Sequence, residues 1–179
     1  MARRAAPYCR FAAFVCLLAA CAQTTGTWPP APPAGPVAAG LPDGVDLAVE
    51  RIVDGDTIVV TGKINVRLIG IDTPETVDPR RPVACFGKEA STFMASLLPK
   101  GTAVRLVGDV EQEDQYGRTL AYVYRREDGL FVNAELVRRG YAQVLTIPPN
   151  LAHTDEFEAA AREARVGSIG LWSACPVPG

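Results

Sequence analysis

The fold of this chain is decided by one stretch, Val66-Arg67-Leu68-Ile69-Gly70-Ile71-Asp72-Thr73-Pro74-Glu75. Its first half is apolar and largely β-branched, which is typical of a buried strand, and Arg67 must point to the opposite face of that strand. Its second half has the composition of a helix start, with a capping residue, a proline and an acid. Pro79 and Pro82 follow too closely for a helix to form. The stretch therefore leaves one arginine and two carboxylates at a strand end, a set suited to a phosphate and a metal ion.

Short β segments and helices flank this stretch. Alternating apolar residues, bounded by turns such as Asp54-Gly55-Asp56, predict strands at residues 47–53, 57–61, 64–71, 103–107 and 120–125. One-sided apolar patterns predict helices at residues 86–98, 133–139 and 156–166, the last capped by Asn150 or Thr154. Residues 141–145 are expected to be extended. Five strands with a helix after the third are the order of an OB-fold Greek-key barrel, a mainly β form of the α+β class. A generic α+β sandwich is the alternative.

The N-terminal region has the organisation of a signal peptide. Three arginines precede the apolar segment 11–20, which is too short to span a bilayer. Leu18-Ala19-Ala20-Cys21 resembles a bacterial lipobox, so residues 1–20 are interpreted as a lipoprotein signal peptide and Cys21 as the lipidated residue; an ordinary cleavage site is the alternative. Residues 21–44 form a Pro-rich linker, 45–175 a single domain and 176–179 a tail. We expect an exported protein, either anchored in a membrane and facing the periplasm or cell exterior, or secreted.

Cysteine usage fits export. Cys9 and Cys16 leave with the signal peptide, and Cys21 carries lipid if the lipobox is real, so Cys85 and Cys175 remain. An even pair in an exported protein predicts a disulfide, with two buried free thiols as the alternative. A zinc site is disfavoured because the single histidine has no ligand spacing to either cysteine.

The charge balance excludes binding of nucleic acid by bulk electrostatics. Without residues 1–20 the chain has 15 basic and 20 acidic residues, a net charge of −5. Any anion site must therefore be local.

Two further charged positions could complete such a site. Asp56 and Asp72 both lie at strand ends of the three-stranded meander expected at residues 47–71. One rim of that sheet could therefore hold both carboxylates around a hard cation such as Ca²⁺. For Asp56, a plain Asp-Gly turn is the alternative. Arg118 follows a Tyr-Gly turn, and with Arg67 it could grip a phosphate. Structural salt bridges are the alternative for either arginine. The rest of the acidic stretch 111–117 is expected to be a solvated loop.

Together these motifs resemble the staphylococcal nuclease-like, or thermonuclease, domain. The resemblance runs in order from about Glu50 to Trp172. It is carried by residues 53–57, 66–75, 86–91, 114–124, 132–140 and 170–172.

The resemblance implies an OB barrel and a role for each matching residue. We expect the protein to be a monomer. Asp56, Asp72 and the carbonyl of Thr73 would bind Ca²⁺. Glu75 would position or deprotonate the attacking water, while Arg67 and Arg118 would clamp the phosphate. Tyr116 and Arg81 would contact the substrate. The implied reaction is hydrolysis of DNA or RNA that leaves a 3′-phosphate.

Departures from the family pattern concern the nucleotide site. Thr146 and Pro148 stand where tyrosines are expected, and Gln115 replaces a lysine. Loss of stacking, worth roughly 1–3 kcal/mol per base, would weaken nucleotide binding without changing the phosphate chemistry.

A binding module without catalytic activity is the alternative function. A domain that had lost catalysis would have no reason to keep all five residues Asp56, Arg67, Asp72, Glu75 and Arg118. A purely structural envelope lipoprotein would leave the same residues unexplained. The sequence leaves open the preference for DNA or RNA and the choice between endo- and exonuclease action.

Overall fold

Five strands close into a barrel in the order β1-β2-β3-β6-β5. The computed structural model describes residues 40–76 and 84–175. The barrel strands are β1 (Val45–Ile52), β2 (Thr57–Val60), β3 (Ile64–Leu68), β5 (Ala103–Val107) and β6 (Thr119–Arg125). Closure arises because β5 pairs with both β1 and β6, so the predicted OB barrel is confirmed and the open sandwich is excluded.

One junction of the barrel is parallel and brings together segments distant in sequence. β3 pairs with β6 in the register Val66↔Thr119 and Arg67↔Leu120, whereas the other four junctions are antiparallel. This register places Arg67 in β3 close to Arg118, the residue that precedes β6.

The predicted third strand, 64–71, is in fact two strands. β3 ends at Leu68, and Ile71–Asp72 form β4, which pairs with β7 (Gln143–Val144). The chain bends at Gly70, whose φ of +79° is in the left-handed region that glycine adopts without strain. A Cβ at this position would also collide with the ring of Phe157. After the bend the chain leaves the barrel, because β4 belongs to a separate two-stranded sheet with β7.

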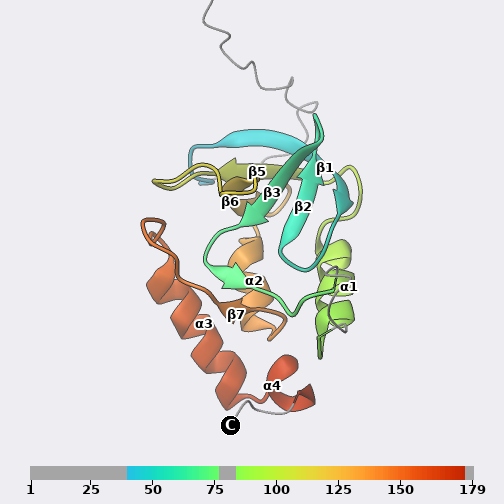
Figure 1. Cartoon of the computed structure of the whole chain (residues 1–179), viewed down its shortest axis with the longest axis vertical. Coiled ribbons are helices and arrows are strands. Elements are labelled where there is room, and N and C mark those ends of the chain that lie inside the picture. Colours follow the sequence, from blue (N-terminus) through green and yellow to red (C-terminus); the bar gives the residue numbers. More distant parts are fainter. Residues whose placement is uncertain (1–39, 77–83, 176–179) are drawn as a thin grey trace, which may run out of the picture.

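Four helices lie on one side of the barrel, below it in Figure 1. They are α1 (Gly87–Leu97), α2 (Val132–Arg138), α3 (Thr154–Val166) and α4 (Leu171–Ala174). Three were predicted; the four-residue α4 was not, because it is too short to show a periodic pattern. The predicted caps of α3 are wrong: His153 is the N-cap residue, and its side chain makes no capping bond. No helix in residues 40–76 and 84–175 is both long and apolar enough to cross a membrane.

A buried asparagine joins the helices to the barrel. Asn133 is fully buried, its Oδ1 accepts a hydrogen bond from the amide of Val123 (2.9 Å), and its Nδ2 donates to the carbonyl of Ile69 (2.9 Å). One side chain thus ties α2 to β6 and to the segment that follows β3.

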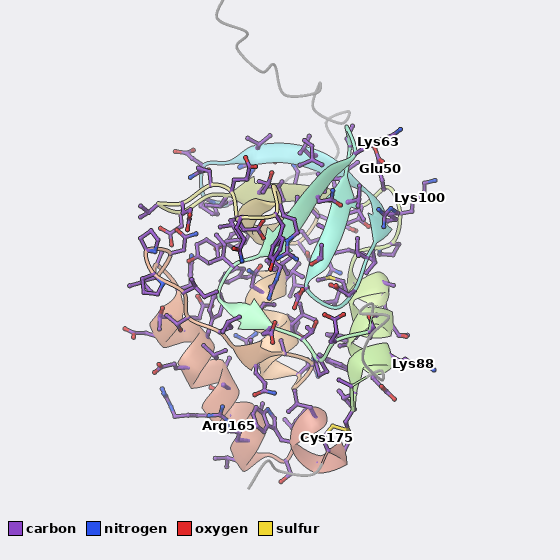
Figure 2. All side chains as sticks on the ribbon, viewed as in Figure 1. Glu50, Lys63, Lys88, Lys100, Arg165 and Cys175 are labelled. Carbon is purple, nitrogen blue, oxygen red and sulfur yellow. A yellow bond between two sulfur atoms is a disulfide. The ribbon has the colours of Figure 1, made fainter. Side chains whose placement is uncertain are left out.

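The predicted disulfide is present. Cys85 and Cys175 are bonded across a separation of 90 residues, and Figure 2 shows the bond beside Cys175 at the end of the molecule opposite the barrel. The signal peptide, Cys21 and nearly all of the linker lie outside the described residues, as do Arg81 and the tail 176–179.

Candidate active site

The five residues singled out by the sequence line one polar pocket at the rim of the barrel. The pocket has a volume of about 180 Å³. Its lining consists of Asp54, Asp56, Arg67, Asp72, Thr73, Pro74, Glu75 and Arg118.

Arg67 organises the carboxylates of this pocket. Its Nη2 lies 2.9 Å from Asp72 Oδ1 and 3.3 Å from Asp56 Oδ2. Its Nη1 donates to the carbonyls of Leu68 and Ile71, both at 2.8 Å, so the guanidinium also braces the bend after β3. Arg67 therefore forms the structural ion pairs that were the alternative to phosphate binding. Its guanidinium also lines the pocket, and phosphate binding stays a prediction.

Asp56 is buried, and its position is fixed by the segment that follows β4. The backbone amide and the hydroxyl of Thr73 donate to Asp56 Oδ2 at 2.8 Å and 3.0 Å. The approach is close because Gly55 has no side chain: a Cβ there would lie 2.7 Å from Thr73 Oγ1. The Asp-Gly-Asp turn is therefore shaped for this contact.

Negative charge is concentrated in the pocket. Burial, and then repulsion by the Asp56 carboxylate, raises the pKa of Asp54 to about 6. The same two causes raise the pKa of Asp72, against the opposing effect of Arg67. Crowded carboxylates of this kind favour an added cation, and an all-oxygen donor set suits Ca²⁺.

The protein side chains alone would not complete a metal site. Within the described ranges no three His, Cys, Asp or Glu side chains are grouped so that they could hold a metal ion. The fit to Ca²⁺ therefore depends on Asp56, Asp72, the Thr73 carbonyl and additional oxygens from water or phosphate.

Arg118 enters the pocket from the turn before β6. Its Nε donates to Asp114 Oδ2 (2.7 Å), and Asp114 Oδ1 accepts from the backbone amides of Arg118 and Tyr116. Burial raises the pKa of Asp114, but these bonds outweigh it and lower the pKa overall. The guanidinium lies 5.5 Å from the ring centroid of Tyr116, which is 75% exposed. Asp114 thus orients Arg118 toward the pocket.

Glu75 lies on the exposed side of the pocket, directly after the bend region that holds Asp72. Its Oε1 accepts a hydrogen bond from the backbone amide of Thr76 (2.9 Å). Glu75 thus adds a fourth acidic side chain to the lining of the pocket.

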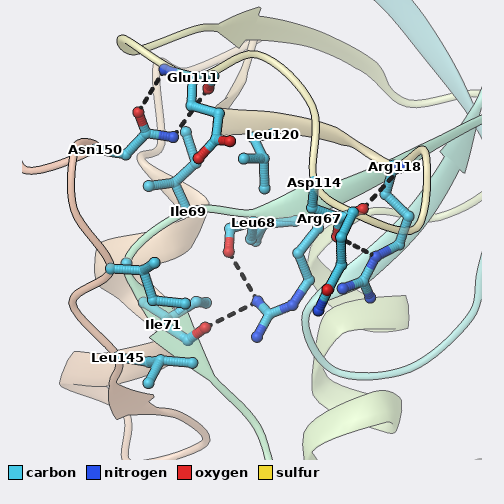
Figure 3. Close-up of a pocket in the computed structure, with 13 residues that line it drawn as sticks. Arg67, Leu68, Ile69, Ile71, Glu111, Asp114, Arg118, Leu120, Leu145 and Asn150 are labelled. Atoms are coloured by element: carbon cyan, nitrogen blue, oxygen red, sulfur yellow. Dashed lines mark hydrogen bonds and ion pairs between the residues drawn. The ribbon is translucent and has the colours of Figure 1, made fainter.

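A second pocket of about 330 Å³ adjoins the first and shares Arg67 and Arg118 with it (Figure 3). Its remaining lining is Leu68, Ile69, Gly70, Ile71, Glu111, Asp114, Gln115, Leu120, Leu145, Ile147 and Asn150. Thr146 and Pro148, expected at the nucleotide site, are not among the lining residues. Leu145 and Ile147 occupy this wall, because alternate residues of an extended segment face the same side.

Sequence reasoning missed Asp54, Glu111, Asp114 and Asn150 as parts of these pockets. Asp54 could have been found, because it shares the Asp-Gly-Asp turn with Asp56. Asn150 gave no signal: it bonds to the backbone of Glu111, 39 residues earlier.

Comparison with known proteins identifies relatives of this chain. Residues 65–174 match the family model described as staphylococcal nuclease homologue. The chain belongs to the staphylococcal nuclease family. This homologue is 41% identical to the thermonuclease of Staphylococcus intermedius over 132 residues, which are 72% of this chain and 77% of that protein. It is 42% identical to the thermonuclease of Staphylococcus hyicus over 128 residues (70% and 74%). Endonuclease YncB of Bacillus subtilis is 35% identical over 133 residues (72% and 62%).

Proposed function

We propose that this staphylococcal nuclease homologue is a Ca²⁺-dependent nuclease that hydrolyses phosphodiester bonds of DNA, RNA or both and leaves 3′-phosphate ends. The observation that carries the proposal is the pocket of about 180 Å³ that gathers two arginines and four acidic residues. The thermonuclease and endonuclease relatives support the same reaction.

Asp56, Asp72 and the Thr73 carbonyl would hold the metal ion. When bound, Ca²⁺ supplies positive charge that offsets the charge developing on the phosphate. Arg67 and Arg118 bind the scissile phosphate from the side that both pockets share. Because their partners Asp72 and Asp114 already fix them, these donors stabilise the transition state with little reorganisation.

Glu75 acts as the general base. It accepts a proton from water as the water oxygen attacks phosphorus, in line with the 5′-oxygen that leaves. The bond from phosphorus to the 5′-oxygen breaks, and that oxygen takes up a proton from solvent. The products are a 3′-phosphate and a 5′-hydroxyl.

The neighbouring pocket takes the nucleoside attached to that phosphate. Its walls include the aliphatic side chains of Leu120, Leu145 and Ile147, and its open end is at the two arginines. Apolar walls with a few polar groups are typical of small-ligand sites. A base held there replaces aromatic stacking with aliphatic contact, which agrees with the weaker binding expected from the sequence.

The proposed location follows from the N-terminal sequence and the disulfide. We propose that a monomer is anchored in a membrane through lipid on Cys21 and faces the periplasm or the cell exterior. The Cys85–Cys175 bond supports export, since disulfides persist in oxidising compartments. Mass spectrometry of the mature N-terminus and light scattering of the detergent-solubilised protein test the anchor and the monomer.

The activity is tested by incubating purified protein with DNA and with RNA in Ca²⁺ and in EDTA. We expect cleavage only with Ca²⁺, and 5′-hydroxyl products that polynucleotide kinase labels without prior phosphatase treatment. Glu75→Gln should lower the rate by about 10²- to 10⁴-fold, the usual contribution of a general base. Glu127→Gln, at an exposed loop position after β6, is the matched control and should leave the rate unchanged. Equal cleavage in EDTA or by Glu75→Gln would refute the mechanism, and binding without cleavage would favour the non-catalytic module.

A further inference from the structure

The pocket beside the phosphate site contains a carboxylate that the proposed reaction does not use. Glu111 and Asp114 are its two acidic residues. Asp114 is engaged by Arg118 and by two backbone amides. In the part of the chain that the structure describes, the Glu111 carboxylate has no hydrogen-bond or ion-pair partner.

The position of Glu111 is nevertheless well defined. The buried Asn150 accepts from the amide of Glu111 through Oδ1 (2.8 Å) and donates to its carbonyl through Nδ2 (2.9 Å). Both ends of the Asn150 amide are therefore used in holding this backbone. Figure 3 shows the Glu111 side chain projecting toward Ile69 and Leu120, which line the pocket. The Glu111 carboxylate therefore lies among aliphatic walls, and the backbone that carries it is held in place by Asn150.

A carboxylate in this position repels phosphate and attracts hydrogen-bond donors. The phosphate end of the pocket is marked by Arg67 and Arg118, so a base inserted between the aliphatic walls meets Glu111 with its polar edge. An ionised carboxylate only accepts hydrogen bonds. Its two oxygens match two adjacent donors best, since bidentate pairs add both energy and specificity.

Guanine is the base that offers such a pair, through N1–H and the N2 amino group. Adenine and cytosine present an amino group beside a ring nitrogen that accepts, and uracil and thymine present one N–H between two carbonyls. In each of these a lone pair faces a carboxylate oxygen. We propose that Glu111 is a specificity-determining residue that selects guanine in this pocket. The inference rests on the proposed function for the placement of the nucleotide.

The test measures competitive inhibition of cleavage by GMP, AMP, CMP and UMP, using the full chain in detergent and a DNA substrate at pH 8 with Ca²⁺. We expect the inhibition constant of GMP to be at least about tenfold lower than that of UMP, as a bidentate base contact provides. In Glu111→Gln, whose amide also donates, this ratio should fall below about threefold. Glu127→Gln is the control and should keep the full ratio.

Direct titration of GMP and UMP by calorimetry separates this inference from the proposed function. A chain that fails to cleave but binds GMP more tightly, with the preference lost in Glu111→Gln, would retain guanine selection and reject the nuclease. Equal constants for the four nucleotides, an unchanged preference in Glu111→Gln, or no binding of any nucleotide would overturn the role of Glu111. Urea midpoints of parent and variant establish that both are folded.

Discussion

Replacing Asn133 by alanine should destabilise the protein far more than its size suggests. The side chain is fully buried and makes two hydrogen bonds, from the amide of Val123 and to the carbonyl of Ile69, both at 2.9 Å. Alanine provides neither hydrogen-bond partner, and water cannot easily reach the two backbone groups at this buried position.

The magnitude follows from the two orphaned groups. A buried backbone donor or acceptor that loses its partner costs about 1–3 kcal/mol. Two such groups give about 2–6 kcal/mol, and we take about 4 kcal/mol as the expected loss. Because domains of this size are stable by about 5–15 kcal/mol, the variant should remain folded at 25 °C but close to its limit.

Equilibrium urea unfolding measures this loss. With a slope of about 2 kcal/mol per M, the midpoint should fall by about 2 M. Asn65→Ala is the matched control, because Asn65 is exposed on β3, and its midpoint should shift little. A loss below about 1 kcal/mol for Asn133→Ala would refute the view that Asn133 joins α2 to the barrel.

Three other changes test the fold. Asp46→Asn should lower the free energy of unfolding by about 1–3 kcal/mol at pH 7, because a hydrogen bond from Arg105 lowers the pKa of Asp46 in the folded protein. This contribution to stability is present above about pH 4, the pKa of an unfolded aspartate, and is lost as the pH falls through the lower folded pKa. Gly70→Ala should lower the melting temperature by at least about 5 °C, because φ is positive and the methyl group meets Phe157. Double replacement of Cys85 and Cys175 by serine should cost about 2–5 kcal/mol in urea unfolding.

Each of these has a clear contrary result. An Asp46→Asn penalty that is the same at pH 7 and pH 2.5 would exclude its ion pair as the cause. An unchanged melting temperature for Gly70→Ala would mean that the bend tolerates a side chain. If the free energy of unfolding were unchanged after the disulfide is reduced, the bond would have no role in holding α4.

The sequence was sufficient for the barrel and for the residues that line the polar pocket, because both depend on local signals. Alternation and turns predicted the five strands, and short motifs carried the acids and arginines of the polar pocket. The two arginines were assigned either to phosphate or to salt bridges. The structure shows the salt bridges, from Arg67 to Asp72 and from Arg118 to Asp114, and both arginines also line the polar pocket. Their binding of phosphate stays a prediction.

What the sequence could not supply depends on contacts between distant residues. Residues 64–71 read as one strand, and two of the contacts at the bend come from far along the chain: Phe157 packs against Gly70, and Asn133 bonds to the carbonyl of Ile69. The acidic stretch 111–117 is exposed at every residue except Asp114, as expected, but the bonds by which Asn150 holds the backbone of Glu111 were not predicted. No pattern within either segment predicts a contact with a residue so far along the chain.

The parallel pairing of β3 with β6 has a consequence for the chain during synthesis. Residues up to α1 already include Asp56, Arg67, Asp72 and Glu75, but Arg118 reaches them only when β6 pairs with β3. A chain still on the ribosome at that stage carries the acids without the second arginine. The polar pocket with both arginines is therefore completed late, with barrel closure, and the nucleic acids around a translating ribosome meet the emerging protein before this pocket has formed.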